Sequence, residues 1–232
     1  MTTLSLDKLK TSDRVNWEPI AFPGVADGVS DPVKRFCYLR HLEVSVADFI
    51  SVTAEKYPDV AAVLQRNVED EDVHFEQLCL LSKHLGLQAD DSLQHEANLI
   101  VAEWNQSDEP SILKAFVLEQ MVFMATLPKL TKETSANVAN VASWVLRDEV
   151  IHVYCNRTLV SQLGLSPSGN LIKLAIKTLL WIFETESVRS QRRVLDTAKL
   201  LLKRGFSAVA TTDNHVIPSS INFFEVDRNI AY

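Results

Sequence analysis

Apolar residues recur every three or four positions along four stretches of the chain, the spacing that places side chains on one face of an α-helix. The stretches span residues 36–50, 60–85, 112–130 and 138–163. Only six of the 232 residues are glycine, which suits long helices because glycine weakens helix interiors. The pattern therefore predicts an all-α protein built on four helices with inward-facing apolar stripes.

Ionisable side chains interrupt each apolar stripe near its middle. An ionised carboxylate in a protein core costs several kcal/mol unless it is paired, and several together repel one another. Divalent cations would balance this charge. The interrupting residues are Glu43, Glu71, His74, Glu119, Glu149 and His152. We therefore predict that these six side chains bind two metal ions in the core.

The spacing of these residues also predicts how the helices pair. The second and fourth stretches each carry Glu-x-x-His, which places both side chains on one helix face. The midpoint between Glu43 and Glu71 is Tyr57, next to Pro58, and the midpoint between Glu119 and Glu149 lies in the polar segment 131–137. Turns at these midpoints would bring the facing residues level in two antiparallel hairpins. Residues 90–105 then predict a helical crossover between the hairpins.

The flanking segments complete the predicted organisation of one domain over residues 1–232. Residues 1–30 predict an irregular N-terminal arm, and residues 31–164 the metal-binding bundle. Residues 170–205 predict accessory helices, an apolar one followed by a basic one, and residues 206–232 a tail. The length suits a single domain with a sizeable core.

Composition and charge limit the functional classes. A net charge of −7 disfavours nonspecific nucleic-acid binding, which needs a basic surface. The three cysteines lie within predicted helices, which favours reduced thiols over disulfides. We see no signal peptide and no apolar run of membrane-spanning length. The sequence therefore predicts a cytoplasmic protein without a membrane or nucleic-acid partner.

Three short motifs resemble those of a known family. Residues 147–152 read Arg-Asp-Glu-Val-Ile-His and are similar to an Arg-Asp-Glu-x-x-His on that family's last ligand helix. Residues 71–76 resemble its other ligand pair, and residues 222–225 read Asn-Phe-Phe-Glu, as near its C-terminus. The family is the metal-bearing small subunit of class I ribonucleotide reductase, among the ferritin-like dimetal carboxylate proteins. The resemblance follows nearly the whole chain in element order and implies a ferritin-like four-helix bundle with additional C-terminal helices.

The resemblance also implies roles for individual residues. Glu71 and Glu149 would bridge two metals, with Glu43 and Glu119 as terminal ligands and one histidine on each metal. Asp148 would hold a ligand imidazole from behind, which metal-bound histidines generally require. The chain is shorter than a usual small subunit and carries Leu78 where the family keeps its radical tyrosine.

Mixed carboxylate and imidazole ligation suits a pair of iron ions or a manganese/iron pair, which can activate O2. We expect a nonheme dimetal oxidoreductase that oxidises a small apolar molecule in a dry pocket. The alternative is a tyrosine-free radical-generating small subunit that serves a reductase large subunit or uses an electron donor. Iron storage is a weaker third possibility. The apolar fifth helix favours a homodimer. The dry surroundings would come from Phe36, Leu78, Phe116, Phe123 and Val145.

Overall fold

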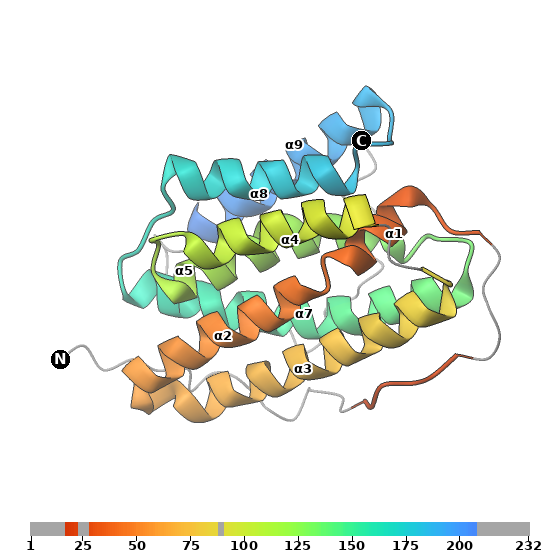
Figure 1. The fold of residues 1–232 in the computed structure, drawn as a ribbon. Coiled ribbons are helices and arrows are strands. Elements are labelled where there is room, and N and C mark those ends of the chain that lie inside the picture. The colour runs from red at the N-terminus through yellow and green to blue at the C-terminus, as the bar shows by residue number, and fades with distance from the viewer. Residues whose placement is uncertain (1–16, 23–27, 88–90, 208–232) are drawn as a thin grey trace.

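The protein is all-α in the part of the chain that the structure describes. The computed structural model describes residues 17–22, 28–87 and 91–207, and every regular element in these ranges is a helix (Figure 1). The predicted all-α class is therefore confirmed. The Asn-Phe-Phe-Glu motif and most of the predicted tail lie outside the described residues, as do parts of the N-terminal arm.

The first predicted hairpin is formed by α2 (His41–Lys56) and α3 (Ala61–His84), which lie side by side (Figure 1). A short 3-10 helix, η2 (Pro58–Val60), follows Tyr57 at the predicted turn. At the end of α3, Gly86 has a φ of 62°. The Leu87 N–H donates to the Ser82 carbonyl there, a helix stop that favours glycine.

One predicted helix is divided. The sequence predicts a single helix from residue 32 to about 55, whereas α1 (Asp31–Tyr38) ends before α2 begins. Arg40 Nη1 donates to the Cys37 carbonyl at 3.1 Å, and this carbonyl would accept from residue 41 in an unbroken helix. Backbone hydrogen bonds between residues three apart, from Leu39 N–H to the Phe36 carbonyl and from Arg40 N–H to the Cys37 carbonyl, replace the regular α-helical pattern here. Phe36 and Leu39 remain buried, so the break redirects the chain without opening the core.

The predicted crossover helix is α4 (Asp91–Gln106), which contacts α1, α2 and α8. The third predicted helix is a run of three elements, α5 (Ser111–Val117), η3 (Leu118–Phe123) and α6 (Met124–Leu130). η3 is a π-helix, which the sequence did not predict. The run packs against α7 (Ala136–Gln162), and α3 also contacts α7, so the two hairpins share one core.

Two further helices, α8 (Gly169–Ile182) and α9 (Val188–Ser207), pack on η3 and lie together at the top of Figure 1. Both predicted accessory helices are thus present, although α8 ends five residues before the predicted 187. The basic residues of α9 are exposed, which is typical of a solvated helix face. They are Arg189, Arg192, Arg193, Lys199, Lys203 and Arg204.

One helix of the described part, Ser111–Leu130, is long and apolar enough to cross a membrane. The expectation that no apolar run reaches this length was therefore wrong. However, 83% of its most apolar window is buried within the protein, and the helix carries Glu119 in its middle. Its apolar character is that of a core helix, consistent with a soluble protein.

Candidate metal centre

The structure brings all six predicted residues into one buried cluster. Each comes from an element at the centre of the molecule, and each side chain is at most 1% exposed. The helical periodicity explains this, because each residue replaces an apolar side chain on an inward stripe. The contributions are Glu43 from α2, Glu71 and His74 from α3, Glu119 from η3, and Glu149 and His152 from α7.

The cluster consists of two overlapping sets of possible ligands. One set adds Glu43 and His74 to the pair Glu71 and Glu149, and the other adds Glu119 and His152 to the same pair. Within each set one atom per residue lies within 4.8 Å of the others. Two metal ions held by these sets would share Glu71 and Glu149.

The Nδ1 atom of each imidazole faces the carboxylates. His74 Nδ1 lies 3.6 Å from Glu71 Oε2 and 3.5 Å from Glu149 Oε1. His152 Nδ1 lies 2.7 Å from Glu71 Oε1 and 3.9 Å from Glu149 Oε2. The short contact to Glu71 is an ion-pair distance, but its geometry satisfies neither atom as a hydrogen bond. Apart from this contact, the Nδ1 atoms lie 3.5–3.9 Å from these carboxylate oxygens, and the members of each set surround a common position, as ligands of a shared ion do.

Buried polar atoms without hydrogen-bond partners show whether the cluster suits cations. In the described part of the chain, both carboxylate oxygens of Glu43, Glu71 and Glu149 lack a hydrogen-bond partner. Glu119 Oε1 and the Nδ1 atoms of both histidines also lack one. Leaving one such group unsatisfied costs about 1–3 kcal/mol, and a core does not tolerate this many. The residues therefore fit metal ions, and mixed oxygen and imidazole donors suit first-row transition metals.

An aspartate contacts the Nε2 atom of each imidazole, on the ring edge away from the carboxylates. Each aspartate comes from the opposite helix of the α3–α7 pair. His74 Nε2 lies 3.3 Å from Asp148 Oδ2, and His152 Nε2 lies 3.3 Å from Asp70 Oδ2. A proton on Nε2 donated to the aspartate leaves the Nδ1 lone pair free for a cation. Arg66 Nη2, 3.1 Å from Asp70 Oδ1, fixes that carboxylate in turn.

Glu119 has a different environment from the other glutamates. It lies in the π-helical turn of η3, and its Oε2 accepts a hydrogen bond from Asn156 Nδ2 at 2.8 Å. A π-turn inserts one residue into a helix and is frequent at functional sites. Here it sets the position of Glu119 within the core, and Asn156 on α7 fixes one oxygen while the other remains without a partner.

Burial and mutual repulsion dominate the acid–base properties of the metal-free cluster. Burial, with repulsion from neighbouring glutamates, raises the pKa of Glu43 and Glu119 well above the usual value and that of Glu149 to about 7. For Glu71, burial opposes ionisation, but the facing imidazoles outweigh it and lower the pKa. Burial likewise disfavours charged His152, yet the carboxylates around it raise its pKa well above 6.5. Without metals, protons must therefore supply the missing positive charge.

The N-terminal arm adds a residue to the surroundings of the cluster. Trp17 Nε1 donates to Asp148 Oδ2 at 2.7 Å, and its ring stacks on His74 with a centroid distance of 5.9 Å. Gln77 holds this arm by accepting from the Ile20 N–H at 2.7 Å and donating to the Ile20 carbonyl at 3.1 Å. A chain of contacts thus runs from a half-buried indole through Asp148 to His74.

The sequence reasoning missed Asp70, Asn156 and the role of Trp17. A signal for Asp70 was present, because Asp precedes Glu in both Glu-x-x-His segments. Trp17 lies in a segment without helical periodicity, so no pattern in the sequence connects its indole with the cluster. Leu78 is buried at the position where the resemblance implied a tyrosine, so the structure offers no phenol there.

Comparison of the chain with protein-family models, curated proteins and solved structures gives no significant match. The interpretation of the cluster therefore depends on its own residues. Their burial, convergence and missing hydrogen-bond partners show that these groups could hold metal ions.

Proposed function

We propose that the protein is an O2-activating nonheme dimetal oxidoreductase with a ferritin-like bundle, holding two iron ions or a manganese/iron pair. The observation that carries the proposal is the pair of overlapping ligand sets that share Glu71 and Glu149. A structural charge network would pair its oxygens with donors, whereas most of these buried oxygens have none. Four carboxylates also match the charge of two divalent cations.

Each residue of the cluster has a distinct task in this proposal. Glu71 and Glu149 would bind both metals, while Glu43 and Glu119 would each bind one. Bound metals of this type supply open coordination positions and redox chemistry for O2. The protein supplies orientation, because Asp148 fixes the His74 ring and Asp70 fixes the His152 ring. It also excludes water, since the apolar neighbours Phe116, Phe123 and Val145 are at most 1% exposed.

Metal loading of the purified protein tests the proposal. Metal-free protein is incubated anaerobically with Fe(II), or with Mn(II) and Fe(II) together, and the bound metal is counted. We expect two metals per chain, and exposure to air should then give optical and spin-resonance changes of a coupled pair. The Glu43→Gln variant should lose metal, whereas Glu76→Gln, at an exposed position on α3, should not. Less than one tightly bound metal per chain would refute the proposal.

A second candidate function is a radical-generating reductase small subunit without a tyrosine radical. The observation that favours it is the chain from Trp17 through Asp148 to His74. Asp148 Oδ2 faces both the Trp17 Nε1–H group and His74 Nε2, so it could accept the indole proton if metals bound at the cluster took one electron from the indole. Burial opposes ionisation of Asp148, but the hydrogen bonds from His74 and Trp17 prevail and lower its pKa.

The Trp17→Phe variant separates the two candidates. Phenylalanine keeps an aromatic ring against His74 and Trp144 but removes the donor to Asp148. A radical-delivering subunit should keep its two metals and lose activity with a reductase large subunit. An oxygenase should retain turnover of a small apolar substrate. Binding of hundreds of irons per particle would instead indicate storage, and sedimentation would test the expected homodimer.

A further inference from the structure

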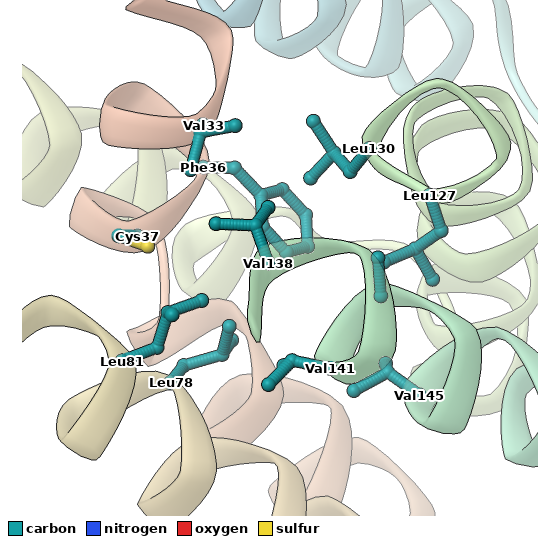
Figure 2. A pocket seen from close by; sticks show the side chains of 11 residues that line it. Val33, Phe36, Cys37, Leu78, Leu81, Leu127, Leu130, Val138, Val141 and Val145 are labelled. Carbon is teal, nitrogen blue, oxygen red and sulfur yellow. The ribbon is translucent and has the colours of Figure 1, made fainter. Parts of the chain in front are cut away.

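An apolar cavity lies between α1, α3, α6 and α7 (Figure 2). Eleven residues line it, and every one of them is buried. Figure 2 shows their side chains gathered from these helices around a common space. The lining consists of Val33, Phe36, Cys37, Leu78, Leu81, Leu127, Leu130, Val138, Val141, Ala142 and Val145.

The cavity adjoins the candidate metal centre on two helices. Leu78 follows His74 by four residues on α3, and Val145 precedes Glu149 by four residues on α7. Four residues correspond to about 6 Å along a helix and to the same face. Phe36, which lines the cavity, packs edge-on against Phe123, with a centroid distance of 6.0 Å.

The size and lining of the cavity decide what it can hold. Its volume is about 10 Å³, close to the minimum for one water-sized molecule. Water needs two to four polar partners in such a place. The only heteroatom in the lining side chains is the Cys37 sulfur, and burial raises the pKa of this thiol to about 12. The cavity is therefore dry and suits a small apolar molecule, whereas a longer chain would displace its walls.

We propose that this cavity binds molecular oxygen beside the metal centre, as a waiting position for the gas before it reaches the metals. The inference rests on the proposed O2-activating function and adds to it the place where the co-substrate is held. O2 is apolar and small enough for a cavity of this volume. The leucine at position 78 contributes directly, because a larger polar side chain there would occupy the space.

Xenon under pressure tests the cavity independently of any metal. Crystals of metal-free wild-type protein should show one xenon atom among the lining residues. Ala142→Leu, which fills the space, should abolish this xenon, and Val138→Ala, which widens it, should increase its occupancy. Ala175→Leu is the matched control, since Ala175 is buried in α8 outside the lining. Absence of xenon from the wild-type cavity would overturn the inference.

The metal-loaded protein then tests the link to O2. Ala142→Leu should keep two metals per chain and slow the reaction with O2 several-fold, whereas Ala175→Leu should react like the wild type. Equal rates in all three proteins would overturn the inference while leaving the metal site intact. Xenon binding in a protein that takes up no metal would refute the proposed function, and with it O2 as the natural occupant.

Discussion

Replacing Glu149 by glutamine should stabilise the metal-free protein and at the same time abolish binding of two metals. Glu149 is fully buried, and both of its oxygens lack hydrogen-bond partners. In the metal-free state its charge is buried and is repelled by that of Glu71, so a neutral side chain of the same shape should relieve both costs. With metals present, the same change removes a ligand that both ion positions share.

The magnitude follows from the pKa of Glu149, which is raised from 4.5 to about 7. The folded protein binds this proton more tightly than the unfolded chain, so stability decreases as the pH rises from 4.5 to 7 and stays low above. Each pKa unit corresponds to about 1.4 kcal/mol, which gives a penalty of about 3 kcal/mol at pH 8. The buried amide also needs partners, which reduces the expected gain to about 2 kcal/mol.

Thermal and chemical unfolding at pH 8 measure this effect. Without metal, Glu149→Gln should unfold about 4–8 °C above the wild type, given the usual relation for a protein of this size. Added Fe(II) should raise the wild-type midpoint because ligand binding favours the folded state, and should leave the variant nearly unchanged. The exposed Glu76→Gln should match the wild type in both conditions. A metal-free variant that is less stable than the wild type would refute the charge-repulsion argument.

Three further predictions concern the surroundings of the cluster. Asp70→Asn should weaken metal binding at the His152 side by roughly 10–100-fold, the usual effect of losing the hydrogen-bond partner of a ligand histidine. Competition with a chelator will measure the affinity, and an unchanged value would show that Asp70 does not support the site. Metal affinity should fall as the pH decreases from 8 to 6, because protons on the imidazoles and on Glu149 must leave before metal binds. Calorimetry in buffers of different ionisation enthalpy will count these protons, and zero release would contradict the charge assignment. Leu78→Tyr should destabilise the protein by about 1–3 kcal/mol through overpacking of the small cavity, and urea denaturation that shows no loss would mean that the walls can yield.

Much of the core arrangement followed from periodicity. The stripes that contain Glu43 and Glu119 predicted inward-facing carboxylates, and both are buried. The turns after Lys56 and Leu130 lie where equal spacing on both sides required them. Such features are local in sequence or repeat with the helical period, so one sequence is enough to predict them.

Other features depend on contacts that periodicity does not encode. At the break after Tyr38, an arginine side chain bonds a backbone carbonyl that a continuous helix would use. The π-turn at Glu119 shifts the register by one residue without a sequence signal that we can name. Trp17 acquires its partner Asp148 across 131 residues, and an irregular arm carries no pattern that points to a distant helix.

The aspartates behind the two histidines are exchanged between helices: Asp70 of α3 supports a ring from α7, and Asp148 of α7 supports a ring from α3. Neither hairpin alone can therefore orient its own imidazole. Tight metal uptake should appear only after the two halves of the chain have docked, so metal affinity becomes a readout of late assembly. A displacement of either helix would loosen both ion positions together, which makes the centre an all-or-none unit.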